Sequence, residues 1–318
     1  MKKKILSALV IVLLIVAVMG GGFGAFLLVI TEKGVDLPLD GYSYPLLLKA
    51  NGWEETMNVD FSTITSLDDL AAAHWFPTKH GLRKEEYWCP DMIDFSDAEA
   101  LIIHSEKSAA HVCSDDKCPL NGIFTGGIET RSVAGGSDVP FTQAFGYFEA
   151  EVQVPTGTGM WSAFWLQSDN MGRVGDQGKD GSEIDIYESS FIKNPTFSGN
   201  ALHYDTYEWP RYQSYGKVSD TKVNLYDGQY HRYGLLWTPE EYVFFVDGVP
   251  VWATAFGGVS RTAEYLRLTV EIRTGGIGPY GQDIGEFENR ADGSNDFKIK
   301  SVVVYQNDSF KSEIRTYA

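Results

Sequence analysis

Short runs of β-favouring residues recur along most of this chain, and turn-forming residues separate them. The runs are rich in Val, Ile, Phe, Tyr and Trp, which suit a pleated and half-buried strand. They comprise residues 100–105, 123–131, 146–154, 162–167, 182–188, 230–238, 241–246, 266–273 and 297–305. Many short strands at such intervals predict an all-β fold, in which two sheets stack as a sandwich or jelly roll.

The clearest local signal is Asp247-Gly248, which separates the apolar runs 242–246 and 249–252. Both central residues of a type I′ turn have positive φ, so this pair predicts a hairpin. Only residues 68–74 and, briefly, 240–242 have a helical pattern. With 43% hydrophobic residues, the chain has enough apolar side chains for one large core, which excludes intrinsic disorder.

The charge balance and several absent motifs narrow the function. A net charge of −17 argues against a nucleic-acid partner, because binding to phosphates depends on Lys and Arg. Residues 276–281 match a glycine-rich nucleotide motif by letters, but Pro279 and the lack of a following helical pattern identify a loop. The six histidines lack metal-ligand spacing. We therefore expect no nucleotide, redox or catalytic metal cofactor.

The N-terminus reads as a targeting segment. Lys2, Lys3 and Lys4 precede an uncharged stretch over residues 5–31 that is long enough, at ~1.5 Å per residue, to cross a bilayer as a helix. It is a signal peptide or an uncleaved anchor; residues 23–30 stay apolar beyond three glycines, which favours the anchor. Either alternative makes the remainder extracytoplasmic. We expect a linker over 32–57, a main domain over 58–307 and a tail over 308–318.

The three cysteines, Cys89, Cys113 and Cys118, are too few for a disulfide scaffold and lack zinc-site spacing. In an oxidising compartment Cys113 and Cys118 are close enough in sequence to close a small loop, and either is also able to pair with Cys89. Buried, inert thiols are the other alternative.

The acidic motif at residues 183–188 is the candidate catalytic site. In a strand over residues 182–188, alternation places Glu183 and Asp185 on one face and Ile184 and Ile186 on the other. Glu188 would point to the apolar face of a regular strand, but one extra residue in a β-bulge would return it to the acidic face. The sequence thus predicts a bulge. A solvated outer strand would carry the same letters, so the motif alone is not specific.

Three carboxyl groups so close together repel one another, so at least one keeps its proton near neutral pH. An acid beside an ionised carboxylate is the pair that cleaves a glycosidic bond. Two Glu side chains on one face can approach to about 5–5.5 Å, the separation typical of retaining enzymes.

Around this motif the chain resembles glycoside hydrolase family 16, over about residues 58–306. Beyond residues 183–188, the similarity rests on residues 125–131, 145–150, 159–166, 230–239, 242–248 and 302–306. The resemblance implies a jelly roll of two stacked sheets with a concave cleft for a long polysaccharide. It also implies that Glu183 is the nucleophile, that Glu188 is the general acid and then base, and that Asp185 orients Glu183.

The resemblance also suggests substrate-binding residues. Trp161 and Trp165 are similar to the family's cleft tryptophans, with core packing as the alternative. Glu149 matches a position that binds sugar hydroxyls, although a salt bridge on an edge strand is an alternative. His203 and Tyr204 follow the motif on the next expected strand, and a structural role for His203 stays open.

Trp209, and Tyr207 before it, are expected over the same cleft. The chain also departs from the family's pattern at several positions. Arg273 and Glu271 replace residues of other types, and we expect both to face the cleft, where Arg273 reads a charged substituent or joins an ion pair. Glu151 stands where many relatives carry Arg.

Lys300 replaces an Asp that in relatives helps to bind a structural calcium, which leaves calcium doubtful even with Asp296 nearby. We expect a monomeric, extracytoplasmic endo-β-glycan hydrolase that retains anomeric configuration. Its expected substrate is a β-1,3 or mixed-linkage β-glucan. The alternatives are a transglycosylase on the same scaffold and a non-catalytic glycan-binding module.

Overall fold

The computed structural model describes residues 36–39, 52–110, 113–114, 118–119, 121–131, 139–188, 191–206 and 211–317. The chain divides into two units, residues 1–33 and 34–318, and every described residue belongs to the second. The expected N-terminal helix over 5–31 therefore lies outside the described residues. Within the described ranges, no helix is long and apolar enough to cross a membrane.

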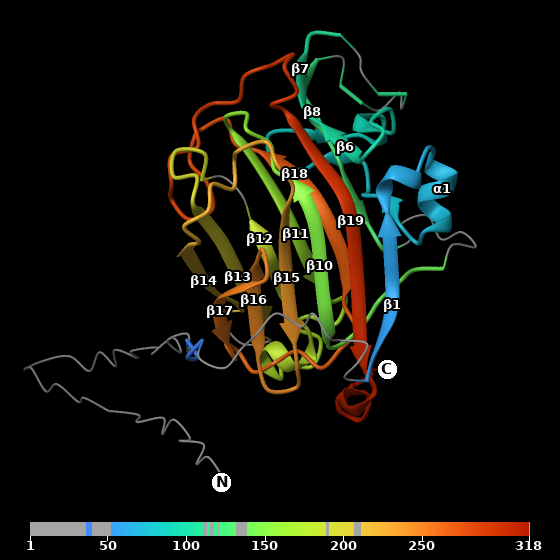
Figure 1. Cartoon of the computed structure of the whole chain (residues 1–318), viewed down its shortest axis with the longest axis vertical. Coiled ribbons are helices and arrows are strands. Elements are labelled where there is room, and N and C mark those ends of the chain that lie inside the picture. The colour runs from blue at the N-terminus through green and yellow to red at the C-terminus, as the bar shows by residue number, and fades with distance from the viewer. Residues whose placement is uncertain are drawn as a thin grey trace, which may run out of the picture. The chain divides into compact units, whose positions relative to one another are not determined.

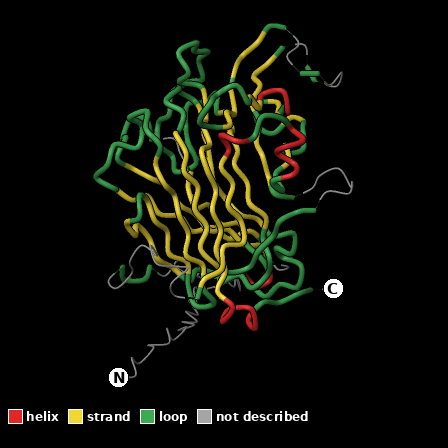
Figure 2. The backbone as a smooth tube through the Cα atoms, turned by 45° about the vertical axis from the view of Figure 1, so that its right-hand side comes forward, coloured by secondary structure: helices red, strands yellow, loops and turns green. Residues whose placement is uncertain are grey.

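Two large antiparallel sheets stack face to face, as the sequence predicts (Figures 1 and 2). The first has the order β17 (Val249–Thr254), β16 (Tyr242–Val246), β15 (His231–Trp237), β10 (Gly146–Gln153), β19 (Asp296–Asn307), β6 (Leu101–His104) and β5 (Ile93–Asp94), and β1 (Trp53–Asp60) also pairs with β19. The second has the order β14 (Tyr212–Asp220), β13 (Phe197–Asp205), β12 (Glu183–Glu188), β11 (Met160–Gln167), β18 (Tyr265–Ile272), β9 (Gly127–Glu129) and β2 (Phe76–Pro77).

A small third sheet lies at one end of the sandwich. It comprises β3 (Gly81–Leu82), β4 (Tyr87–Trp88), β8 (Gly122–Thr125) and β7 (Glu106–Ser108). The expected strand over 123–131 is therefore two strands, which separate at Gly126 and enter different sheets. A Cβ on Gly126 would lie 3.2 Å from the carbonyl oxygen of Cys89, so the close packing at this crossing favours glycine.

Helical structure is sparse. It comprises α1 (Leu67–Ala72) and the 3₁₀ turns η2 (Phe61–Thr63), η3 (Pro90–Met92), η4 (Gln177–Asp180) and η5 (Asp308–Glu313). The helix expected at 68–74 is α1, whose N-cap Ser66 accepts a hydrogen bond from the backbone of Asp69. The helical reading of 240–242 is wrong, because a turn there leads directly into β16.

The main core lies between the two large sheets. Alternation along β10 points Phe148 and Ala150 into this core, together with Ile184 and Ile186 of β12 from the opposite sheet. The hairpin at Asp247 and Gly248 is also confirmed, with φ of 48° and 79° as a type I′ turn requires.

Both boundaries of the expected main domain need correction. At the N-terminal side β1 begins at Trp53, inside the expected linker, and the backbone of Leu37 donates to the carbonyl of Ala253 at 2.8 Å. At the other end, Phe310 of the expected tail packs against Trp53 and Phe145, with ring centroids 5.7 and 6.2 Å away. Apolar side chains at both ends thus extend the domain.

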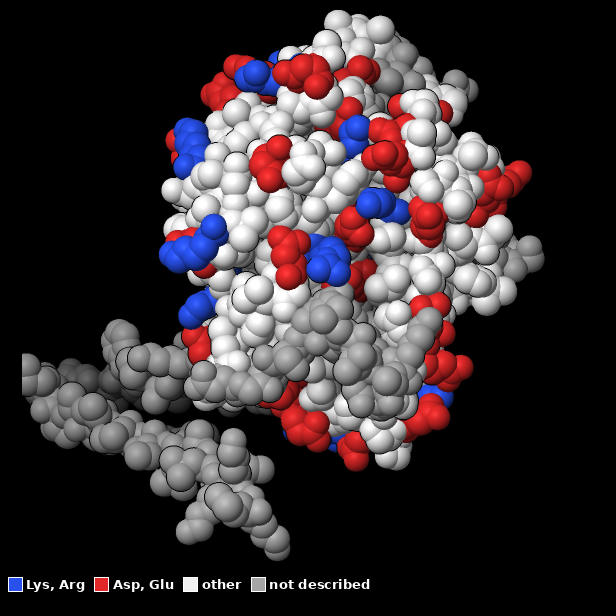
Figure 3. All heavy atoms as spheres, viewed as in Figure 1, with Lys and Arg blue, Asp and Glu red and all other residues white. Residues whose placement is uncertain are grey.

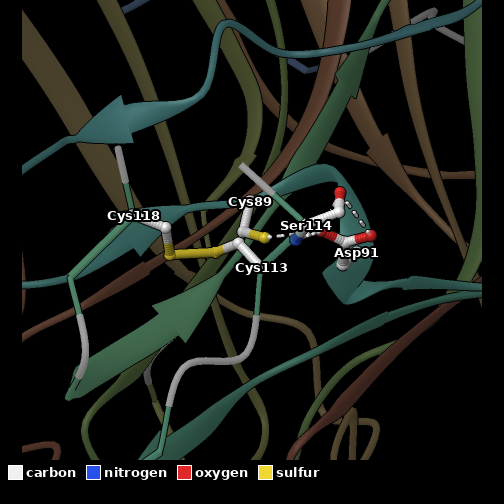
Figure 4. Close-up of a disulfide and its surroundings, with 5 residues drawn as sticks. All are labelled: Cys89, Asp91, Cys113, Ser114 and Cys118. Carbon is white, nitrogen blue, oxygen red and sulfur yellow. Dashed lines mark hydrogen bonds between the residues drawn. A yellow bond between two sulfur atoms is a disulfide. The ribbon is translucent and has the colours of Figure 1, made fainter. Parts of the chain in front are cut away.

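A disulfide joins Cys113 and Cys118, one of the pairings that the sequence left open. Cys89 is a free, buried thiol that donates to the carboxylate of Asp91 at 3.4 Å (Figure 4). Burial, together with the nearby Asp91 carboxylate, raises the pKa of Cys89 to about 12. The thiol is therefore protonated and unreactive at neutral pH.

Candidate active site

The predicted bulge is present in β12. Asp185 pairs with Trp165 and Tyr187 pairs with Phe164, which leaves Ile186 as an extra residue. The amide of Asn200 on β13 donates to the freed carbonyl of Ile186 at 2.6 Å. The register shift against β13 falls at the same place. The extra residue rotates the end of the strand, so that Glu188 shares a face with Asp185.

All three predicted catalytic carboxyl groups line one cavity of about 60 Å³ on the face of the second sheet. Strands β11, β12 and β18 supply its floor, and two cations from the β3–β4 connection close one side. The complete lining comprises Arg83, Lys84, Trp161, Ala163, Trp165, Glu183, Asp185, Glu188, Thr269 and Glu271.

Glu188 is buried and receives a hydrogen bond on each oxygen. The indole N–H of Trp161 donates to Oε1 at 3.1 Å, and the hydroxyl of Tyr280 donates to Oε2 at 2.7 Å. Burial and the negative charge of Asp185 raise the pKa of Glu188 to about 8, against the opposing effect of the Tyr280 hydrogen bond. Glu188 therefore holds a proton at neutral pH, as a general acid must.

Glu183 lies at the other end of the acidic row. The amide of Gln167 lies 3.4 Å from its Oε2, and burial with the charge of Asp185 raises the pKa of Glu183 to about 7. Burial and mutual repulsion thus favour a proton on at least one of these carboxyl groups near neutral pH.

His203 balances part of this negative charge. Its Nε2 lies 3.0 Å from Oδ2 of Asp185, its Nδ1 is 2.6 Å from the hydroxyl of Ser214, and its ring stacks on Tyr212. Burial alone would lower the pKa of His203, but the bond to Asp185 and the surrounding carboxylates raise it to about 9. His203 is therefore an imidazolium that holds Asp185 rather than an isolated structural histidine.

Both tryptophans predicted to bind sugar line the cavity, and each has a cation over its ring. The ammonium of Lys84 lies 3.9 Å from the centroid of Trp161, and the guanidinium of Arg267 lies 4.1 Å from that of Trp165. Trp165 is only 6% exposed and donates to Thr269 at 3.0 Å. Packing and cavity lining thus coexist in the same side chains.

The sequence did not indicate Arg83 and Lys84. Both pair with the carboxylate of Glu271, Arg83 at 2.8 Å. Glu271 lines the cavity as expected, and Arg273 lies 5.0 Å from the ring of Trp161. The ion pair that was an alternative role for this region forms between Glu271 and the cations of the β3–β4 connection. A run of consecutive charged residues is typical of an exposed turn, so nothing in its letters indicated the cleft.

Two predicted sugar contacts are corrected. Glu149 lies on β10 of the first sheet, on the face opposite Phe148 and Ala150, and it accepts a hydrogen bond from Tyr147 at 2.6 Å. It therefore faces away from the second sheet. Tyr204 alternates with His203 along β13, so it packs in the core while His203 faces the carboxyl groups.

Trp209 and Tyr207 lie outside the described residues. A second hollow of about 370 Å³ lies beside the first, on the side of Gln167 and Glu183. Aromatic and charged side chains surround it: Lys79, Trp88, Glu129, Arg131, Gln167, Ser168, Asp169, Met171, Tyr265 and Arg267. The open surface therefore extends beyond the carboxyl row, as a polymer would require.

Two groups in the described residues bring at least three metal-type ligand atoms together: the three cysteines, and Glu183 with Asp185 and His203. A disulfide occupies two members of the first group, and the ion pair between His203 and Asp185 joins two of the second. Near the expected calcium position, the ammonium of Lys300 pairs with Glu151 at 2.9 Å. Asp296, which kept that question open, pairs with His104 at 2.5 Å.

A two-sheet sandwich with a bulged row of three carboxyl groups in an open cleft has the chemical groups that a glycoside hydrolase needs. The model of the glycosyl hydrolases family 16 matches residues 88–265. The chain belongs to this family.

Relatives of known name support the same assignment. The chain is 28% identical over 172 residues to the endo-1,3-1,4-beta-glycanase ExsH of Rhizobium meliloti, a match that covers 53% of this chain and 32% of that protein. It is 31% identical over 103 residues to a beta-glucanase of Rhodothermus marinus, covering 32% and 35% of the two chains. The chain thus spans about a third of the length of these relatives.

Solved structures share the fold. The laminarinase catalytic domain of Thermotoga maritima superposes with a TM-score of 0.57 at 18% identity, covering 80% of this chain and 98% of that one. Porphyranase B of Zobellia galactanivorans gives a TM-score of 0.60 at 19% identity, covering 80% and 92%. At such identities the likeness concerns the β-sandwich alone.

Proposed function

We propose that this protein is an extracytoplasmic endo-β-glycan hydrolase that cleaves internal β-glycosidic bonds with retention of anomeric configuration. The observation that carries the proposal is the bulge at Ile186, which brings Glu183, Asp185 and Glu188 into one cavity. A regular strand would bury Glu188 in the core, where it would reach no substrate.

In the first step, Glu188 donates its proton to the glycosidic oxygen as the bond from that oxygen to C1 breaks. The carboxylate of Glu183 attacks C1 and forms a covalent glycosyl-enzyme. Asp185, which pairs with the His203 imidazolium at 3.0 Å, orients Glu183.

In the second step, the ionised Glu188 takes a proton from a water molecule, which attacks C1 and releases Glu183. The released sugar has its original anomeric configuration, because two inversions have occurred. Each residue returns to its starting protonation state, so the cycle needs no external acid, base or oxidant.

A β-1,3 or mixed-linkage β-glucan is the proposed substrate. The names of the relatives from Rhizobium meliloti and Rhodothermus marinus support a β-glucan. The open hollow beside Gln167, with Trp88 and Tyr265 in its wall, supports a polymer whose chain continues beyond the cleaved bond.

We further propose that Arg273 distinguishes charged from neutral glycans, since its guanidinium lies 5.0 Å from the ring centroid of Trp161, which lines the cavity. Arg273→Ala should then reduce cleavage of anionic glycans more than that of neutral ones. Unchanged preference among these substrates would refute this role. Arg290→Ala is the matched control, because Arg290 pairs with the exposed Glu288.

The proposed location rests on the sequence. Lys2–Lys4 and the apolar residues 5–31 favour export with a retained N-terminal anchor, and a cleaved signal peptide is the alternative. Fractionation of cells that express the full chain, with mass spectrometry of its N-terminus, separates these two outcomes.

The test of the activity is incubation of the full chain with a panel of β-glucans and red-algal galactans, with products sized and their anomers followed by NMR. Internal cleavage with retained configuration is the expected result. Longer products formed in the presence of an acceptor sugar would indicate a transglycosylase. Binding without cleavage, in wild type and Glu183→Gln alike, would indicate a glycan-binding module and overturn the proposal.

A further inference from the structure

We infer that Tyr280 is a positioning residue for Glu188, which keeps the exchangeable proton of Glu188 on Oε2 and serves both protonation states of that carboxyl group. The inference rests on the proposed function for its role in turnover. Tyr280 lies in the glycine-rich loop 276–281, whose sequence resembles a nucleotide motif only by letters.

The two hydrogen bonds on Glu188 differ in kind. An indole N–H only donates, so the oxygen that faces Trp161, Oε1, must remain an acceptor. A phenol both donates and accepts. Tyr280 is therefore able to donate to the Glu188 carboxylate, and to accept when Oε2 carries the proton.

This division matches the two steps of the proposed reaction. Before bond cleavage, the proton of Glu188 lies on Oε2, the oxygen from which Tyr280 is able to accept a hydrogen bond. Glu188 then transfers this proton to the leaving oxygen of the glycan. After transfer, the hydroxyl of Tyr280 donates to the carboxylate and orients it to accept the proton of the attacking water. The indole of Trp161 cannot switch from donor to acceptor, so it always donates to Oε1. The hydroxyl of Tyr280 is able to switch, so it can bond to Oε2 in both protonation states.

The second sheet is built to receive the Tyr280 ring. A Cβ on Gly199 would lie 2.4 Å from the ring, and a Cβ on Gly216 would lie 3.0 Å from it. Gly199 pairs with Glu188 across the strands, so the missing side chain lies directly beside the carboxyl group. Phe191 packs against the ring with centroids 5.7 Å apart. Two glycines on adjacent strands thus form the seat for one tyrosine.

Several charged and titratable groups face Glu188 from the elements around it. They are Glu183 and Asp185 of β12, His203 of β13, Tyr212 of β14, Glu271 of β18, and Lys84 and Tyr280 of the loops. Of these, Tyr280 donates a hydrogen bond directly to Glu188. Its removal withdraws a donor from the charged form, so the pKa of Glu188 should rise.

The experiment compares wild type with Tyr280→Phe, which keeps the ring in its seat. We expect the basic limb of kcat/KM to move up by about one pH unit, and kcat on polymeric glycan to fall roughly tenfold with KM little changed. Gly199→Ala, which displaces the ring, should move the limb in the same direction. Tyr305→Phe is the matched control, since its hydroxyl donates to Glu55 on the first sheet at 3.0 Å.

A second measurement does not depend on turnover. In protein with ¹³C-labelled glutamate carboxyl groups, the Glu188 signal is assigned from its loss in Glu188→Gln, and its titration midpoint should rise in Tyr280→Phe. If wild type cleaves no glycan but the midpoint rises, the inference about Tyr280 stands and the proposed function fails. If wild type is active and neither midpoint nor limb moves, the inference is overturned.

Discussion

Two strands of this molecule carry acidic residues at alternate positions, and only one of them forms the site. On β10 of the first sheet Glu149 and Glu151 lie two residues apart, as Glu183 and Asp185 do on β12 of the second. Glu149 accepts a hydrogen bond from Tyr147, and Glu151 pairs with Lys300. Each acid of β10 thus has a neighbour that satisfies it.

On β12 the acidic side chains are more crowded than on β10. The bulge adds Glu188 to the row, and His203 is the cation that contacts it most closely, at 3.0 Å from Asp185. Burial and crowding raise the pKa values of Glu183 and Glu188, which favours a proton on at least one of them near neutral pH. In the proposed mechanism the protonated group is Glu188. Alternating acids are therefore only a precondition; the extra residue, and the burial of three carboxyl groups close together, perturb their pKa values.

The distribution of surface charge bears on which acids matter for the chemistry. On the face shown in Figure 3, acidic and basic side chains are interspersed. The net charge of −17 is therefore not gathered into one acidic patch on that face. The chemically important acids are the buried ones of the cleft.

The largest expected effect separates the two strands directly. Glu183→Gln should lower kcat by roughly 10⁴-fold or more, because the nucleophile is lost while the cavity keeps its shape. Glu149→Gln, the matched change on β10, should change kcat less than about twofold. Initial rates on a β-glucan, with binding measured separately, check both values. Comparable losses in the two variants would contradict the distinction drawn between the strands.

The next prediction concerns the bulge. Asn200→Ala removes the donor that binds the freed carbonyl of Ile186, a contact that is fully buried. We expect a loss of ~1–3 kcal/mol in the free energy of unfolding, and a fall in kcat as Glu188 loses its fixed orientation. Denaturant unfolding and initial rates measure the two effects. Asn58→Ala, at an exposed position on β1, is the control. An equal loss of unfolding free energy in this variant would contradict a specific role of the Asn200 contact in stabilising the bulge.

Much of this arrangement follows from sequence periodicity, and the exceptions have physical causes. The strands, the hairpin and the bulge were predictable because each depends on residues close together in the chain. The place of Glu149 was not, because alternation assigns Glu149 to the polar face of its strand without saying which of the two sheets contains that strand. Arg83 and Tyr280 reach the site through loops, where no period exists and the fold alone decides what lies nearby.

The pH dependence of stability should also distinguish the cleft from the first sheet. The folded pKa of His203 is raised to about 9, so its contribution is complete below about 6.5 and is lost as the pH rises through 9. The pKa values of Glu183 and Glu188 are raised as well, so ionisation of these two groups lowers the stability of the folded state. Stability should therefore fall from about pH 4.5 to pH 9. His203→Gln should flatten the upper part of that fall, which melting temperatures measured across this pH range would show.

The smallest effect is expected on β10. Lys300 and Glu151 are both partly exposed, so their ion pair contributes at most ~1 kcal/mol and weakens with salt. Lys300→Met should change the free energy of unfolding by no more than this, and its kcat should equal that of wild type. Urea unfolding at low and high ionic strength measures the difference. A larger loss, or one that salt does not reduce, would show that the acids of β10 need their partner as strictly as the cleft acids need His203.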